Sequence, residues 1–253
     1  RIAKPHVRKI ERDDGVMIVD DSIGEKPYTD ENDMICWHYD HSQQRTVKGI
    51  NFVTCLYHCQ GVSLPIGFEI VRKTEKYLDP KSGKEKRRSN RTKNEMYRDL
   101  MAQAVKNQIL FKYALNDIWF ASAENMNFVK ITLEKEFAMP LKGNRKVATS
   151  AEAKQNGRYQ SVDTLELEPM KPVTVYLEGV EFPLLLVKQV FTNEDGSTGI
   201  LYLVTSDTTL EGNGITTIYQ KRWNVEPYHK SLKQNASLEK SPTQTVATQT
   251  NHF

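Results

Sequence analysis

The chain has 253 residues, of which 38% are hydrophobic and 26% charged, and its formal net charge is +3. This composition is typical of a globular protein and excludes a disordered chain. No apolar run approaches the roughly 20 residues that a membrane-spanning helix needs, so we expect no membrane association. The three cysteines, sparse and odd in number, fit a reducing compartment. Because the first residue is not Met, we expect the chain to be a fragment.

Apolar and β-forming runs predict adjacent strands near the start of the chain, followed by alternating helices and strands. Strands are predicted at residues 16–19, 50–58, 64–71, 111–115 and 137–141. Apolar residues at helical spacing predict helices at residues 94–110 and 123–137. This order predicts an α/β fold, in which helices cover the faces of a mixed sheet.

The pattern changes near residue 145, where β-rich runs replace the alternation of helices and strands. Runs at residues 173–177, 182–191 and 200–205 predict an antiparallel β-rich insertion, and Asn193-Glu194-Asp195-Gly196 predicts a hairpin turn within it. A helix is predicted from residue 215 to about residue 233. The predicted organisation is a lead, the first part of a core, an insertion, and a last helix with its tail, at residues 1–15, 16–144, 145–212 and 213–253.

Basic side chains cluster between residues 81 and 98. Eight basic residues stand there against two acidic ones, namely Lys81, Lys84, Lys86, Arg87, Arg88, Arg91, Lys93 and Arg98. Such a cluster can neutralise DNA phosphates, and Lys86, Arg87 and Arg88 are the candidate contacts. The alternative is a solvated loop, since runs of charge are common on protein surfaces.

Carboxylates end two of the predicted strands, the first at Asp20-Asp21 and a later one at Asp117. Ligands of α/β sheets bind outside the carboxyl ends of the strands, so parallel neighbours would bring these acids together. Converging carboxylates repel each other, and a magnesium ion relieves the repulsion by taking oxygen ligands. The alternative is that these are ordinary turn residues, a frequent use of Asp.

The last predicted helix carries an acid among polar and basic side chains. At about 100° per residue, four side chains fall in one narrow stripe, namely Tyr219, Arg222, Glu226 and Lys233. The acid can complete a metal site, and the cations can hold phosphate oxygens. The alternative is a solvated face with an Arg–Glu pair four residues apart. Pro227 is expected to kink or end this helix.

The spacing Tyr-x2-Arg-x3-Glu-x6-Lys resembles the YREK signature of DDE transposases from bacterial insertion sequences. The segment Val19-Asp20-Asp21-Ser22 resembles the first acid motif of that family, an Asp at a strand end followed by Ser or Thr. The segment Asn116-Asp117-Ile118-Trp119-Phe120-Ala121-Ser122 resembles the second motif, an Asp followed by an aromatic pair. The resemblance covers about residues 16 to 235.

The resemblance implies a ribonuclease H-like fold that binds two Mg²⁺ ions, with Mn²⁺ as the alternative ion, through Asp20, Asp117 and Glu226. It implies an enzyme that cuts DNA at transposon ends and joins the 3′ ends to target DNA, working as a homodimer at the bacterial nucleoid in the cytoplasm. Arg222 and Lys233 would hold phosphates near the cut, and Tyr219 would position one. Asp20 is preferred to Asp21 as the first acid because Ser22 follows it at two residues.

Other functions stay open at this point. The chain could be a truncated, non-catalytic remnant that binds DNA, or another ribonuclease H-like nuclease such as a junction resolvase. A zinc site among Cys55, His58 and Cys59, with Cys36 and His38 upstream, fits no known zinc spacing, and alternation along a strand explains these residues better. Trp223 could stack on a base, but we expect it in the core.

Overall fold

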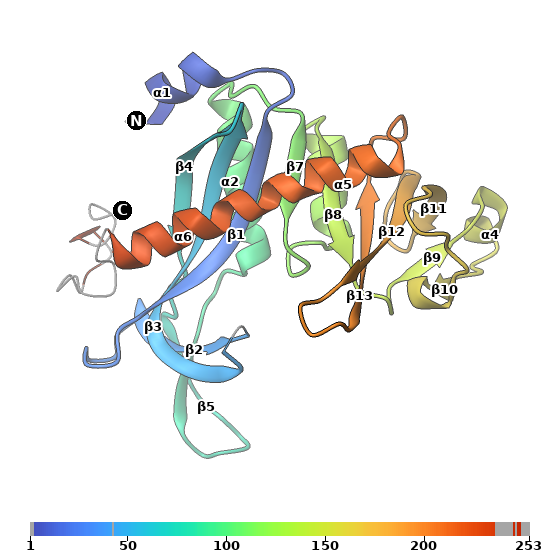
Figure 1. Cartoon of the computed structure of the whole chain (residues 1–253). Coiled ribbons are helices and arrows are strands. Elements are labelled where there is room, and N and C mark those ends of the chain that lie inside the picture. The colour runs from blue at the N-terminus through green and yellow to red at the C-terminus, as the bar shows by residue number, and fades with distance from the viewer. Residues whose placement is uncertain (1–2, 42, 236–244, 246, 249–253) are drawn as a thin grey trace.

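The computed structural model describes residues 3–41, 43–235, 245 and 247–248. The centre of the molecule is one large mixed sheet (Figure 1). Its central strands are β1 (Val16–Glu25), β3 (Arg45–Cys59), β4 (Val62–Ile70), β7 (Tyr113–Asn116) and β8 (Glu136–Leu141). Strand β1 pairs with β3 in antiparallel fashion and with β7 in parallel, β4 adds to β3, and β8 lies parallel to β7. This arrangement confirms the predicted mixed sheet and is that of a ribonuclease H-like fold.

The β-rich segment after residue 145 continues the same sheet. Its strands are β9 (Lys146–Ala148), β10 (Gln160–Ser161), β11 (Val173–Leu177), β12 (Leu184–Thr192) and β13 (Thr198–Thr205). Strand β13 pairs antiparallel with β8, and the β12–β13 hairpin turns at the predicted position. Gly196 closes that turn with a φ of 80°, a left-handed conformation that glycine adopts without strain.

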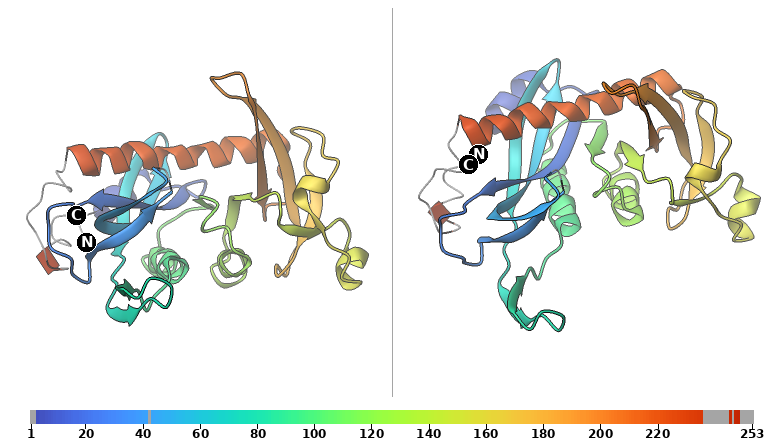
Figure 2. Two further views of the ribbon diagram at one scale, coloured as in Figure 1. Left: turned by 90° about the horizontal axis from the view of Figure 1, so that it is seen from below. Right: turned by 60° about the horizontal axis from the view of Figure 1, so that its bottom comes forward.

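Helices cover both faces of the sheet (Figure 2). Helices α2 (Lys93–Lys106) and α3 (Ala123–Asn127) lie on one face, and a rod made of α5 (Gly212–Gln220) and α6 (Val225–Gln234) crosses the other. Side chains alternate accordingly along β1. Met17 and Val19 pack in the core on the α2 side, whereas Val16 and Ile18 pack with Tyr219 and Val225 of the rod. Even-numbered and odd-numbered residues of β1 therefore face different helices. We call this even or odd position the parity of a residue.

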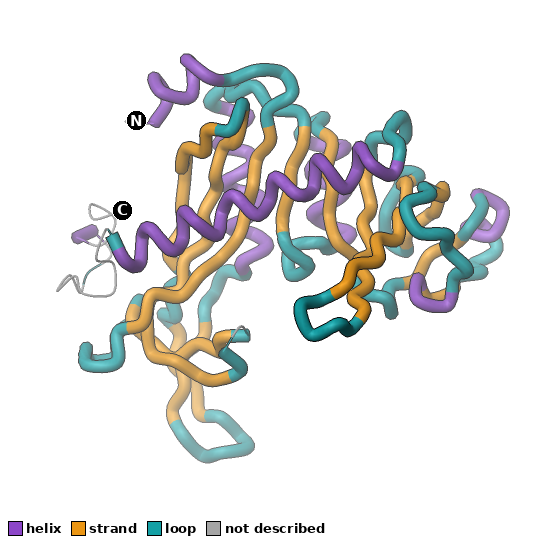
Figure 3. Tube along the Cα trace, in the orientation of Figure 1, coloured by secondary structure: helices purple, strands orange, loops and turns teal. Residues whose placement is uncertain are grey.

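The rod is continuous but not uniformly α-helical (Figure 3). A 3-10 segment, Lys221–Asn224, joins α5 to α6. Pro227 lies in the first turn of α6, where a backbone N–H has no partner within the helix, so the proline is tolerated there. The expectation that Pro227 ends the helix is therefore wrong, since α6 continues to Gln234. The stripe predicted at 100° per residue also needs correction, because the 3-10 segment has 3.0 residues per turn and rotates the side chains differently.

Several predicted boundaries also need correction. Strand β1 does not stop at Asp20 but runs to Glu25, because β3 pairs with it over its whole length. The helix predicted at 123–137 ends early: α3 passes into a π-helical turn, Phe128–Thr132, before β8 begins.

Several shorter elements do not follow from the periodicity of the sequence. These are α1 (Ala3–Ile10), β2 (Ile35–Asp40), β5 (Glu75–Leu78), β6 (Glu85–Arg88) and α4 (Ala151–Gln155). In the described part of the chain, no helix combines the length and apolar character needed to cross a bilayer.

Candidate active site

The parallel pairing of β1 and β7 brings the first two predicted acids together. Val19 lies opposite Asn116 in this pairing. Asp20 is the next residue of β1, and Asp117 is the residue directly after β7. Asp20 has the same parity as Val16 and Ile18, so it faces the α5–α6 rod. The sheet therefore sets both carboxylates below the same helix.

Burial and mutual repulsion make these two carboxylates hard to ionise. The pKa of Asp20 rises to about 7, because the side chain is buried and because Asp117 and Asp21 carry like charge, while Arg222 opposes the shift. The pKa of Asp117 is also raised, by burial and by the charge of Asp21, against hydrogen bonds from the amides of Trp119 and Phe120. Two such groups favour the approach of a cation.

Asp20 and Asp21 point toward opposite faces of the sheet. The Asp20 Oδ2 atom lies 3.3 Å from Nη1 of Arg222 in the rod. The Asp21 Oδ2 atom lies 2.5 Å from Nζ of Lys93, at the start of α2. The neighbouring acid thus has its own basic partner on the other side, and Asp20 remains the better candidate for the first acid.

Arg222 links the first acid to the third. Its side chain is only 10% exposed, and its guanidinium lies between Asp20 and Glu226, with Nη2 placed 3.5 Å from Oε1 of Glu226. The guanidinium also lies 4.5 Å from the ring centroid of Trp223 and 5.9 Å from that of Tyr219. Among the described residues, its Nε has no hydrogen-bond partner. One buried cation therefore holds together the acids of two elements.

The donor set has the chemistry that a divalent cation requires, but the structure does not gather it completely. Carboxylate oxygens are the ligands that magnesium prefers. Asp20 and Asp117 interact directly through their charges, whereas Glu226 is 56% exposed and is reached through Arg222. In the described part of the chain, no three Asp, Glu, His or Cys side chains are grouped closely enough to bind one metal ion.

The remaining predicted residues lie in different places. Tyr219 is buried, and burial raises the pKa of its hydroxyl to about 12, with Arg222, Asp117 and Asp20 as its charged neighbours. Lys233 lies two helical turns beyond Glu226, where its charge acts on His229. The structure thus places Tyr219 beside the acids and Lys233 further along the rod.

The predicted basic cluster is largely a β-hairpin that projects from the sheet (Figure 1). Its cations are paired with acids over short distances: Lys86 with Asp79 at 2.5 Å, Arg88 with Glu75 at 2.8 Å, and Arg87 with Glu31 at 3.5 Å. It is therefore neither a structureless loop nor a set of unpaired cations.

A hydrogen-bonded pair that the sequence does not indicate supports the site. The Thr54 hydroxyl of β3 donates to the backbone oxygen of Asp20 at 3.2 Å and lies 2.8 Å from Nε2 of His229. Burial lowers the pKa of His229 to about 4, so the ring is neutral, and Nε2–H donates to the hydroxyl oxygen. This contact ties α6 to the strands, one turn after Glu226.

Two other expectations can be compared with the structure. Trp223 is 53% exposed, so the prediction that it belongs to the core is wrong. Cys36 Sγ lies 3.3 Å from Nε2 of His38, but these residues form no metal-binding group of three with any described residue.

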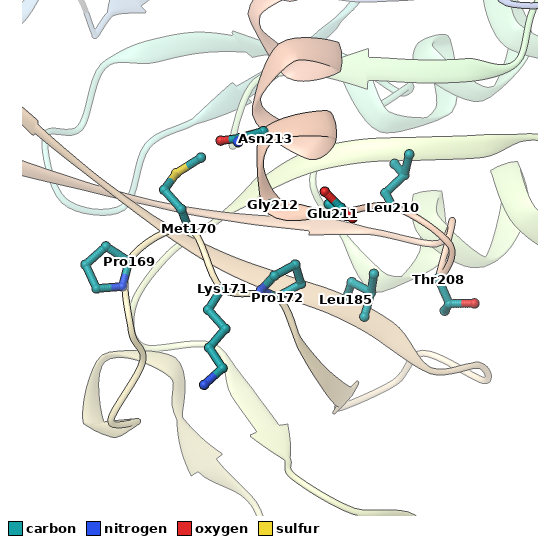
Figure 4. Close-up of a pocket in the computed structure, with 10 residues that line it drawn as sticks. All are labelled: Pro169, Met170, Lys171, Pro172, Leu185, Thr208, Leu210, Glu211, Gly212 and Asn213. Atoms are coloured by element: carbon teal, nitrogen blue, oxygen red, sulfur yellow. The ribbon is translucent and has the colours of Figure 1, made fainter.

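A pocket lies near the start of α5 (Figure 4), and none of the predicted site residues lines it. Its lining includes Met170, Lys171 and Glu211 but none of the acids proposed for catalysis. Gly212 begins the helix there against the carbonyl of Met170, where a Cβ atom would come within 1.9 Å of the oxygen. The close approach fixes the start of the rod against the β-rich segment.

Two known families match the chain. The family described as DDE superfamily endonuclease matches residues 1–164, and the family described as transposase DDE domain matches residues 85–253. The first match contains Asp20 and Asp117, and the second contains Asp117 and Glu226. No curated protein matches the chain. Since each match covers more than half of the 253 residues, the chain belongs to the DDE superfamily of transposases and endonucleases.

Proposed function

We propose that the chain is the catalytic part of an insertion-sequence transposase, which cuts DNA at transposon ends and joins the 3′ ends to target DNA. Asp20, Asp117 and Glu226 are its catalytic acids. The observation that carries this proposal is a pair of partly buried carboxylates, one on β1 and one directly after the parallel strand β7, joined through Arg222 to an acid on the crossing helix.

The three acids would hold two magnesium ions, for which manganese could substitute. When bound, the ions supply an activated nucleophile and stabilise the leaving oxygen of the phosphate. Asp20 and Asp117 are suited to this because they already repel each other in a buried position. Glu226 joins them by leaving Arg222, a contact of 3.5 Å at a half-exposed carboxylate that costs little to break.

Arg222 and Tyr219 would hold the DNA phosphate beside these acids. A guanidinium presents several N–H groups in one plane and binds phosphate oxygens in a bidentate manner. Because its pKa is near 12, the Tyr219 hydroxyl stays protonated at neutral pH and donates a hydrogen bond. Lys233 and the hairpin residues Lys86, Arg87 and Arg88 would contact phosphates further along the duplex. A homodimer would pair the two transposon ends.

The test is cleavage of a duplex that carries the end of the DNA element encoding this chain, with magnesium and then with excess chelator. Glu226→Gln should abolish cutting and leave binding in a gel shift intact, because the amide loses the charge that a hard cation requires. Arg222→Ala should weaken both DNA cutting and DNA binding. Glu211→Gln, an exposed acid at the start of the same rod, is the matched control and should cut normally. Near-normal cutting by Glu226→Gln would show that Glu226 is not the third acid.

A further inference from the structure

Separate segments bring aromatic rings and a cation together at the surface beside the second acid. Tyr39 lies near the end of β2, His41 lies in the following turn, Trp119 follows β7, and Lys142 follows β8. The ring centroids of Tyr39 and His41 are 4.8 Å apart, and those of His41 and Trp119 are 4.6 Å apart. The Lys142 Nζ atom lies 5.0 Å from the Trp119 centroid.

This aromatic cluster does not serve the core. Tyr39 and Trp119 are each 52% exposed, although large aromatic rings gain most from burial. Lys142 is exposed as well, and it forms no ion pair with any residue that the structure describes. A group of open rings with an unpaired cation calls for a ligand that combines an aromatic face with negative charge, which is the chemistry of a nucleotide.

The cluster is fixed relative to the acids. The backbone amide of Trp119 donates to Oδ1 of Asp117 at 2.9 Å, so the ring stands two residues from a proposed metal ligand. Contact with the His41 ring, whose plane is tilted by 43° to that of Trp119, then joins this position to the β2–β3 turn. A base bound on Trp119 would therefore belong to a nucleotide close to the phosphate that is cut.

We propose that Tyr39, His41 and Trp119 form a stacking platform for an unpaired base of the DNA end, with Lys142 holding the adjoining phosphate. This inference rests on the proposed function, since it requires DNA at the acids. Bases within a duplex are stacked on each other, so only an unpaired base can offer a whole face to Trp119. Stacking of a base is stronger than an exposed cation–π contact, so the base can displace Lys142 from the ring toward the phosphate.

The experiment compares two DNA ends by fluorescence anisotropy, in the presence of a chelator so that no cutting occurs. One is a blunt duplex, and the other is the same duplex with an unpaired 3′ extension. The wild-type chain should bind the extended end more tightly. Trp119→Ala should weaken that binding about 5- to 100-fold and leave the blunt duplex unchanged, as expected for the loss of one stacked base.

Further variants separate stacking from charge and from folding. Trp119→Phe keeps a ring and should recover most of the affinity. Lys142→Ala should lower the salt slope by about 0.7 on the extended end only, the value for one phosphate of a single strand. Tyr28→Ala removes a fully exposed ring outside the cluster and should change nothing. Each variant should melt at the wild-type temperature.

The possible failures are distinguishable. If the wild-type chain binds both ends equally and Trp119→Ala changes neither affinity, the platform is overturned while the proposed function stands. In that case the cluster would be a contact for a protein partner. If the wild-type chain binds neither end, the proposed function fails and the platform fails with it.

Discussion

The acid site, made of Asp20, Asp117 and Arg222, and the β5–β6 hairpin both carry clustered charges, but the two clusters differ in burial. In the acid site, the Asp20 and Arg222 side chains are 16% and 10% exposed. In the hairpin, the paired Arg88 and Glu75 side chains are 66% and 46% exposed. Charges that are kept from water act strongly on each other, whereas exposed pairs are screened by solvent and salt. The buried cluster is therefore suited to chemistry, and the exposed one to reversible contact with phosphates.

The largest effect is expected when Asp20 or Asp117 of the acid site is replaced. Asp20→Asn and Asp117→Asn should each lower the cutting rate by more than about 100-fold, because even outer partners of metal ligands cost 10- to 100-fold when they are replaced. Gel shifts should stay close to wild type. The measurement is single-turnover cleavage with magnesium, and a decrease of less than about tenfold would remove that residue from the catalytic set.

Asp20 should also lower the stability of the folded chain once its carboxyl is ionised. Because the pKa of Asp20 is raised from 3.8 to about 7, the folded state holds this proton more tightly than the unfolded state. Stability from this group is lost as the pH rises from about 4 to about 7. Asp20→Asn should therefore raise the melting temperature at pH 8 by at least about 3 °C in the presence of chelator, since a single pKa unit already has that effect. At pH 4 the two proteins should melt alike.

The hairpin should affect binding and not chemistry. Replacing Lys86, Arg87 and Arg88 by Ala should lower the salt slope of duplex binding by up to about 0.9 for each phosphate that these side chains neutralise. Cutting at saturating protein should be unchanged, because the hairpin lies away from the acids. The control replaces Lys76, which lies in the same hairpin but outside the basic cluster, and should leave the slope unchanged. An unchanged slope for the triple variant would leave these residues as a solvated surface.

The sequence is sufficient for the parts of the fold that follow local periodicity. The run at 173–177 is strand β11, and the apolar period at 94–110 marks helix α2. The sequence alone does not show that β1 continues past its aspartates, because that extension depends on pairing with β3 and not on local composition. Nor does it reveal the 3-10 segment in the rod, so it cannot predict that Arg222 contacts both Asp20 and Glu226.

The alternation of side chains along β1 is a stronger reason than the motif for choosing Asp20 over Asp21 as the first acid. Ser22 favours Asp20 through a family resemblance alone, whereas parity is a physical reason. Val16, Ile18 and Asp20 share one face of β1, and Asp21 shares the other with Met17 and Val19. The sequence cannot indicate which face meets the helix that carries Glu226, because both are equally apolar.

Asp21→Asn is the smallest expected effect and tests that parity directly. The substitution breaks the contact with Lys93, whose side chain is 39% exposed, and such pairs contribute at most about 1 kcal/mol. It also removes a negative charge that raises the pKa of Asp20 and of Asp117, so both acids should ionise more readily. Cutting should therefore stay within about fivefold of wild type, the range that an energy of this size permits, and any change near pH 6 should be an increase. The matched comparison is Asp20→Asn, because it makes the same Asp-to-Asn substitution at the neighbouring residue. If Asp21→Asn stops cutting and Asp20→Asn does not, the first acid faces α2, and Arg222 neutralises a residue that takes no part in catalysis.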